Sequence, residues 1–224
     1  MSSALAVFDL DGTITRRDTL APFLFGYLKR HPWRVVRLPF WALAPVKFLF
    51  DRDRTAIKGA VIRAAMGGAQ REGVDQWAEQ FVKQLIPHAL FAEALSAIRE
   101  HRERGDRLLL MSASTDLYVP RIAKALGFDQ VICSEVRWLP DGRLDGRLAT
   151  LNCQGEEKRR CLAAVLARDR FDRVYAYGNA GSDLLHMTLA HEAFLVNGPA
   201  HPKHPMGAAQ TLGRVRALRW QQSA

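Results

Sequence analysis

Short apolar runs recur along the chain, and each of them gives way abruptly to polar residues or glycine. These runs are Ala4–Phe8, Leu108–Met111, Val131–Cys133, Val174–Tyr177 and Ala193–Val196. Fully apolar runs of this length are typical of strands that are buried on both faces of a parallel sheet. Helical spacing lies between them, in Asp116–Leu126 before Gly127, in Glu156–Arg168, and in a segment that runs through Leu189. The alternation predicts an α/β fold with a parallel, doubly wound sheet.

Three segments depart from this alternation. Residues 19–87 are predicted to form helices that are rich in aromatic residues and arginine. Pro140-Asp141-Gly142 is a strong turn-forming sequence, and it predicts a hairpin between residues 136–139 and 143–146. The tail from Pro205 to Gln222 predicts a basic amphipathic helix.

Composition narrows the class of protein. A chain of 224 residues suffices for one core domain and a smaller accessory domain, and 48% hydrophobic with 25% charged residues is typical of a folded protein. Three cysteines without a CxxC pair argue against a disulfide framework or a zinc site, and no secretory signal is visible. A net charge of +9 suits phosphate substrates, an anionic membrane or nucleic acid, or reflects a generally basic surface. No nucleic-acid motif accompanies it.

Polar side chains that can carry chemistry fall at or just beyond the predicted strand ends. They are Asp9, Asp11, Ser112, Asn179 and Asp183. In a doubly wound sheet the carboxyl ends of the strands form the ligand site, so these residues are expected to meet at one edge.

The segment Asp9-Leu10-Asp11-Gly12-Thr13 carries the sharpest signal. Two carboxylates so close together repel each other unless a cation lies between them, and Mg²⁺ accepts few carboxylates together with phosphate oxygens. Asp9 can attack phosphorus, and Asp11 can donate a proton to the leaving oxygen and later take one from water. The alternative is an acidic turn or helix cap, against which the preceding apolar strand argues.

Three further elements have a functional and a structural interpretation each. Ser112 can bind a phosphate oxygen or simply cap a helix. Lys158 can neutralise a transferring phosphoryl group or lie in solvent. The segment from Gly178 to Asp183 can complete a metal site through Asn179 and Asp183, or form a glycine-containing turn before a helix. The order of these elements, each after a strand-like run, favours the functional interpretation.

These motifs resemble those of the haloacid dehalogenase-like superfamily of phosphatases, in its phosphoserine phosphatase-like branch. FDLDGT, MSAS, Lys158 and YGNAGSD correspond to its four motifs. The resemblance implies a Rossmann-like core of residues 1–17 and 88–224 with an inserted helical cap of residues 18–87. It also implies the site roles: Asp9 and Asp11 catalytic, Ser112 and Lys158 phosphate-binding, and Asp9, Asp11 (through its carbonyl), Asn179 and Asp183 as ligands of Mg²⁺. The family's fourth motif usually begins Gly-Asp, whereas this chain has Gly178-Asn179.

The substrate depends on the predicted cap. Residues 33–50 are mostly apolar with interspersed basic residues, and their uninterrupted apolar stretch, Leu38–Val46, is too short to span a bilayer. Such a segment suits an interface with anionic lipid, or packs inward as an ordinary cap. Together with CQGEEK (residues 153–158), it is similar to phosphatidylglycerophosphatase C-like relatives, which implies a phosphorylated lipid headgroup as substrate. The expected location is cytoplasmic, and a lipid substrate would add peripheral contact with the inner face of the membrane.

Two other hypotheses remain open. The first is a small phosphomonoester such as phosphoserine, because Asp18 lies where phosphoserine phosphatases have an acidic residue at the cap hinge. The second is a non-catalytic basic binding protein, because Asn179 departs from the motif. The oligomeric state is left open.

Overall fold

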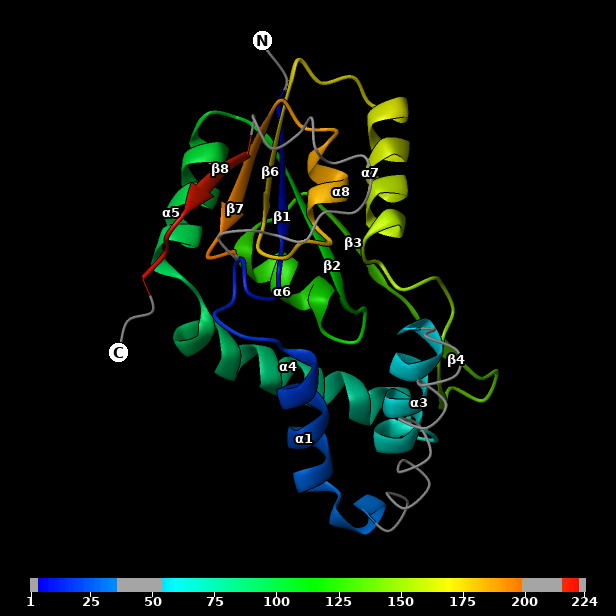
Figure 1. Ribbon diagram of the computed structural model, residues 1–224. Coiled ribbons are helices and arrows are strands. Elements are labelled where there is room, and N and C mark those ends of the chain that lie inside the picture. Colours follow the sequence, from blue (N-terminus) through cyan, green and yellow to red (C-terminus); the bar gives the residue numbers. More distant parts are fainter. Residues whose placement is uncertain (1–3, 36–53, 199–214, 222–224) are drawn as a thin grey trace.

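The computed structural model describes residues 4–35, 54–198 and 215–221 (Figure 1). At its centre is a six-stranded sheet in the order β3-β2-β1-β6-β7-β8, in which every pairing is parallel. The strands are β1 (Ala4–Asp9), β2 (Arg107–Thr115), β3 (Gln130–Ser134), β6 (Arg173–Gly178), β7 (Glu192–Val196) and β8 (Val215–Leu218). All five predicted apolar runs are strands of this sheet.

Helices cover both faces of the sheet because side chains alternate along each strand. In β1, Ala6 and Phe8 belong to the core under α5 (Ala92–Glu103) and α6 (Val119–Leu126). Leu5 and Val7 belong to a second core under α7 (Glu156–Arg168) and α8 (Leu184–Met187). Each such buried side chain contributes about 1.5 to 3 kcal/mol. The predicted doubly wound, Rossmann-like α/β fold is confirmed.

Three helices lie together beyond the carboxyl end of β1, below the sheet in Figure 1: α1 (Leu20–Arg30), α3 (Arg54–Met66) and α4 (Arg71–Ala89). Phe23 of α1 packs on Trp77 and Phe81 of α4, with ring centroids 5.8 and 5.1 Å apart. Tyr118, directly before α6, joins the same cluster at 4.6 Å from Phe23. An aromatic core therefore ties the helical group to the sheet.

The predicted hairpin is present as β4 (Val136–Trp138) and β5 (Leu144–Leu148), and it packs against α3. Gly68 and Ala69, which follow α3, exchange backbone hydrogen bonds of 2.8 and 2.9 Å with Leu144. Gly146 has φ +87°, and a Cβ there would lie 2.3 Å from the Cα of Arg63. Only glycine permits this close approach, which places the hairpin with the helical group although it lies far from it in sequence.

Several predicted boundaries were wrong. The tail is not a helix over residues 215–218, because Val215–Leu218 pairs with β7 and Trp220 packs on Phe91. The helix after Gly178 ends at Met187, and α6 begins at Val119. Ser112 lies inside β2, at the last regular pair with β3 before the register shifts. The segment Leu38–Val46 and residues 205–214 lie outside the described residues.

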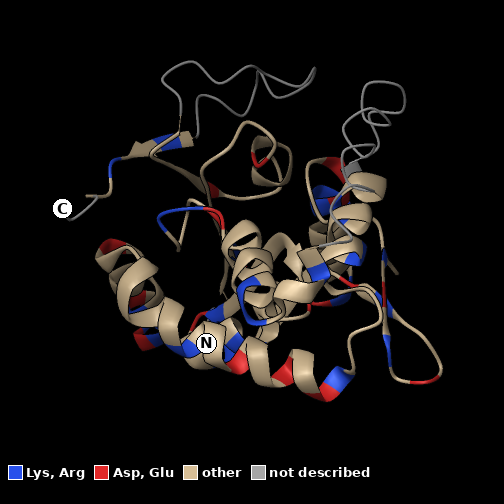
Figure 2. Ribbon diagram, turned by 90° about the horizontal axis from the view of Figure 1, so that it is seen from below, with Lys and Arg blue, Asp and Glu red and all other residues tan. Residues whose placement is uncertain are grey.

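Charged positions are distributed along the helices. Figure 2 views the molecule from the side of the helical group and shows basic and acidic positions interspersed on the helical segments.

Within the described parts of the chain, no helix is both long enough and apolar enough to cross a membrane.

Candidate active site

The site forms where β1 and its two neighbours end. β1 lies between β2 and β6 and ends at Asp9, which is paired in register with Met111. The chain then turns at Gly12, which has φ +80°, and a Cβ there would lie 2.0 Å from the side-chain nitrogen of Asn179. Gly12 therefore leaves room for Asn179, and the first and fourth sequence motifs lie directly against each other.

Lys158 links two carboxylates at this edge. Its Nζ donates to Asp9 Oδ1 at 2.6 Å and to Asp183 Oδ1 at 2.9 Å. All three residues are buried, at 2 to 6% exposure. The Thr13 hydroxyl donates to Asp9 Oδ2 at 3.0 Å, and the backbone N–H groups of Asn179 and Ala180 donate to Asp183 Oδ2. The two carboxylates therefore share one cation and are held in fixed orientations.

Burial and charge act differently on these groups. Burial raises the pKa of Asp9 to about 7, although the Lys158 ammonium opposes this rise. Burial opposes ionisation of Asp183 as well, but the Lys158 ammonium, with the Ala180 N–H, holds its pKa below the usual value. For Lys158, burial lowers the pKa, but the carboxylates of Asp183 and Asp9 outweigh it and raise the pKa. Lys158 is therefore a permanent cation, and Asp9 is the carboxylate that would gain most from further positive charge.

Asp11 is held by hydroxyl groups. Its Oδ1 accepts hydrogen bonds from the N–H and hydroxyl of Thr19, at 2.8 and 2.6 Å. Its Oδ2 accepts from Ser114 Oγ at 2.7 Å and from Ser112 Oγ at 3.3 Å. Burial raises the pKa of Asp11, and the Thr19 and Ser114 hydrogen bonds oppose that rise. A carboxyl with a raised pKa suits a group that exchanges protons during a reaction.

A cavity of about 180 Å³ opens over these residues. It is lined by Asp9, Asp11, Asp18, Leu20, Lys58, Ala113, Ser114, Gln154, Lys158, Asn179, Ala180, Ser182 and Asp183. Five predicted site residues are thus brought together. Ser112 is fully buried and is absent from the lining, and its hydroxyl accepts the N–H of Ser114 at 3.0 Å. Ser114 takes the lining position that the sequence suggested for Ser112.

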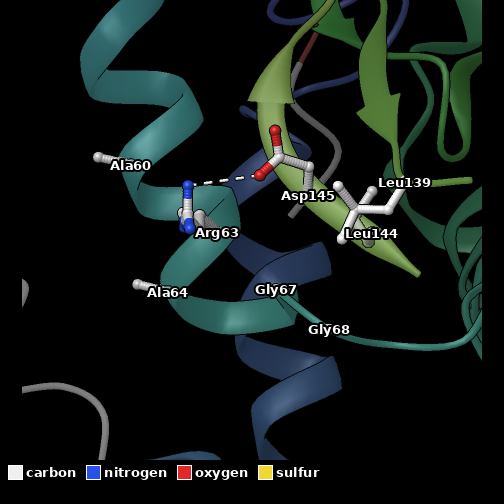
Figure 3. A pocket seen from close by; sticks show the side chains of 8 residues that line it. All are labelled: Ala60, Arg63, Ala64, Gly67, Gly68, Leu139, Leu144 and Asp145. Carbon is white, nitrogen blue, oxygen red and sulfur yellow. Dashed lines mark ion pairs between the residues drawn. The ribbon is translucent and has the colours of Figure 1, made fainter. Parts of the chain in front are cut away.

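A larger cavity, of about 620 Å³, lies between α3 and the hairpin (Figure 3). Arg63 reaches across from α3 to Asp145 on β5 with an ion pair of 3.3 Å. Small residues, Ala60, Ala64, Gly67 and Gly68, form much of its wall. None of the predicted site residues lines it, so the smaller cavity is the candidate active site.

The donor atoms of the small cavity fit Mg²⁺. Among the described residues, no group of three or more His, Cys, Asp or Glu side chains is placed to hold a metal ion. The available donors are instead two carboxylates, of Asp9 and Asp183, and neutral oxygens of Asn179 and of the Asp11 backbone. An all-oxygen set with few carboxylates suits Mg²⁺. The buried Asp9 carboxylate with its raised pKa gives the electrostatic reason for a cation here.

Sequence reasoning missed three contributors. Lys58 reaches the cavity from α3, and no local motif marks it. Ser114 was visible as the second serine of MSAS. His186 is fully buried, 3.9 Å from Asp183 Oδ1, and neither ring nitrogen has a hydrogen-bond partner among the described residues. Burial, aided by Lys158, lowers the pKa of His186 to about 3, so the imidazole is neutral.

Comparison with known proteins adds independent evidence. The family model of haloacid dehalogenase-like hydrolases matches residues 6–187. The protein CicA of Caulobacter vibrioides is 31% identical over 197 residues, which cover 84% of this chain and 83% of that protein. A probable phosphatase of Mycobacterium tuberculosis is 28% identical over 204 residues, covering 86% of this chain and 68% of that protein. A substrate-bound phosphoserine phosphatase matches the fold with a TM-score of 0.62 at 16% identity, over 89% of each chain.

Proposed function

The chain belongs to the haloacid dehalogenase-like hydrolase family, and from this premise we propose that it is a Mg²⁺-dependent phosphomonoester hydrolase that forms an aspartyl-phosphate on Asp9. Membership confirms the resemblance of the motifs and the prediction of an enzyme. One observation carries the proposal: Asp9 and Asp183 share Lys158 at the carboxyl end of β1, in a small polar cavity that also contains Asp11.

Each side chain has a role in this reaction. Asp9 attacks phosphorus through one carboxylate oxygen. The Thr13 hydroxyl donates a hydrogen bond of 3.0 Å to the other oxygen, Oδ2, and so holds the carboxylate in place. Lys158 lies against Asp9 and offsets the negative charge of the phosphoryl group as it transfers. Bound Mg²⁺, held by Asp9, Asp183, Asn179 and the Asp11 carbonyl, would supply further charge neutralisation.

Asp11 acts as the general acid and base. It protonates the leaving oxygen when the phosphoryl group moves to Asp9, and then takes a proton from the water that hydrolyses the aspartyl-phosphate. Thr19 and Ser114 fix its orientation, and Thr19 is in turn bonded to the Tyr118 hydroxyl at 2.9 Å. Because Thr19 directly precedes α1, the acid is tied to the start of the helical group.

The helical group is the natural cap of this site. We propose that α1, α3 and α4 select the leaving group, as the predicted cap of residues 18–87 would, and that the β4–β5 hairpin acts with them because it packs against α3. Closed caps exclude water and so favour transfer to the intended acceptor.

The size of the cavity bears on the substrate. About 180 Å³ is less than the roughly 300 to 1,000 Å³ of pockets that enclose drug-sized ligands. The buried part of the substrate is therefore compact, and two substrates meet this condition: a small phosphomonoester, or the headgroup of a phosphorylated lipid whose chains remain outside. The exposed Asp18 in the lining favours the first, whereas the apolar segment that suggests the second lies outside the described residues. Cytoplasmic location and peripheral contact with an anionic membrane stay predictions.

The test is phosphate release by the wild type and Asp9→Asn, with Mg²⁺ and with EDTA. The panel contains phosphoserine, glycerol phosphate and a phosphatidylglycerophosphate-like lipid in mixed micelles. Release that requires Mg²⁺ and is lost in Asp9→Asn supports the proposal, and the preferred ester separates a small substrate from a lipid headgroup. A folded wild type that releases no phosphate from any ester would instead favour the non-catalytic binding protein.

A further inference from the structure

Lys58 connects the helical group to the catalytic loops. Its side chain leaves α3, and Nζ donates to the Ala113 carbonyl at 2.6 Å and to Asn152 Oδ1 at 2.6 Å. Ala113 lies between Ser112 and Ser114, and Asn152 precedes the loop that leads to α7. The ammonium thus lines the candidate active site at the place where three separate segments meet.

Lys58 forms no ion pair with a carboxylate in the part of the chain that the structure describes. Both of its hydrogen-bond partners are neutral oxygens. Asp11 and Asp18 are near enough to influence it, but the Asp11 oxygens are engaged by Thr19 and Ser114. Partial burial lowers the pKa of Lys58 because the charged form loses solvation.

An ammonium group has three donors, and two are used here, so one remains for a ligand. An anionic oxygen is the partner that restores the solvation lost on burial, because hydrogen bonds between charged groups are stronger than neutral ones. The cavity that Lys58 lines is the place from which such an oxygen can approach.

We propose that Lys58 binds a second anionic group of the substrate, carried by the leaving part of the molecule. The phosphoryl group itself must lie against Asp9 and Lys158, whereas Lys58 enters from α3, in the helical group that faces the leaving part. This inference rests on the proposed function and names its substrate class: phosphomonoesters of alcohols that carry a carboxylate or a phosphodiester. The P–O bond breaks, the leaving oxygen takes a proton, and the second anion stays unchanged.

Matched substrates separate this role from simple support of the fold. The pair is 4-carboxyphenyl phosphate and phenyl phosphate, which differ in one anionic group away from phosphorus. For the wild type we expect a preference in kcat/KM of about 10- to 100-fold for the carboxylated ester, the value of one hydrogen bond between charged groups. Lys58→Met should abolish that preference mainly through KM, and Lys58→Arg should keep part of it.

Arg63→Met is the matched control, because Arg63 is a cation of the same helix that lines the other cavity. It should leave the preference unchanged. The inference is overturned if the wild type shows no preference, if Lys58→Met slows both esters equally, or if Arg63→Met has the same effect as Lys58→Met. Phosphoglycolate and glycerophosphoglycerol phosphate then distinguish a carboxylate from a phosphodiester as the preferred anion.

A binding measurement keeps the inference independent of turnover. Calorimetric titration of Asp9→Asn with 4-carboxyphenyl phosphate should give a Kd that rises about 10-fold or more when Lys58→Met is added. If Kd rises in this way but the wild type turns over no ester, the proposed function is wrong and the anion site at Lys58 is still supported. An unchanged Kd, with a thermal melt showing folded protein, would refute the anion site.

Discussion

Two lysines line the candidate active site, and their surroundings are opposite. Lys158, from the core, lies between two buried carboxylates and has a raised pKa. Lys58, from α3, has neutral partners and a lowered pKa. The difference separates two tasks that one residue type can perform. A lysine whose charge is satisfied within the protein organises the reacting groups, whereas a lysine whose charge is not satisfied is available to the substrate.

The largest effect is expected for Lys158→Met. Phosphate release should fall by at least about 10³-fold, because the phosphoryl group loses its cation and Asp9 loses its orientation. The exposed Lys83 on α4, which forms an ion pair with Glu79, provides a control, and Lys83→Met should retain wild-type kinetics. If Lys158→Met kept activity within a factor of a few of wild type, Lys158 would not organise the reacting groups as we propose.

The next effect concerns Asp11. Asp11→Asn should slow hydrolysis of an alkyl phosphate by about 10²- to 10⁴-fold, since the leaving alkoxide needs a proton. It should slow hydrolysis of 4-nitrophenyl phosphate much less in the transfer step, because that leaving group departs without protonation. Burst kinetics separate this step from hydrolysis of the aspartyl-phosphate. An equal loss for both esters in the burst would argue that Asp11 acts in another way.

Stability sharpens the contrast between the lysines. Without Mg²⁺, Lys158→Met leaves two buried carboxylates unpaired and should lower the free energy of unfolding by about 3 to 5 kcal/mol. Lys58→Met removes a cation that holds no carboxylate, and should cost less, about 1 to 3 kcal/mol, through two lost hydrogen bonds. Urea unfolding of both variants measures the difference. Equal costs would mean that Lys58 has an anionic partner within the protein.

The last effect concerns a carboxyl group outside the cavity. Burial raises the pKa of Asp116 from 3.8 to about 6, although the hydrogen bond that its carboxylate accepts from the Val136 N–H opposes the rise. The folded state therefore holds a proton more tightly than the unfolded state, and the stability from this group is full below about pH 4 and lost as the pH rises to about 6. Asp116→Asn, which keeps an acceptor for Val136, should gain about 2 kcal/mol over wild type at neutral pH and little near pH 4. Urea unfolding at both pH values tests this, and a gain independent of pH would contradict it.

The two sides of the cavity also differ in how far the sequence predicts them. Asp9, Asp11, Asn179 and Asp183 were predicted and are brought together, because they follow β1 and β6, apolar strands whose positions in the parallel sheet are set by local pattern. Lys158 was also predicted, and it joins them from the first turn of α7. Lys58 was not, because its approach depends on how α3 packs, which no short motif encodes. Ser112 and Ser114 lie two residues apart in one motif and both donate to Asp11. Ser114 lines the cavity and Ser112 does not, and the pairing of β2 with β3 becomes irregular just after Ser112, which no short motif encodes.

The tail shows the same limit. Its basic and apolar spacing predicts a helix, yet Val215–Leu218 completes the sheet, where β7 offers an unpaired edge. Pairing of Asn197 with the backbone of Trp220 fixes the register there, with hydrogen bonds of 2.9 and 3.1 Å. Contacts between distant segments, rather than propensity, decide such a strand.

Phosphorylation of Asp9 is tested by an acid quench during turnover. Wild-type protein mixed with Mg²⁺ and an excess of the preferred ester is quenched, digested, and examined by mass spectrometry. We expect one added phosphoryl group on the peptide that contains Asp9, absent without Mg²⁺ and absent in Asp9→Asn. Turnover in which the phosphoryl group appears on another residue, or in which Asp9→Asn remains active, would contradict it.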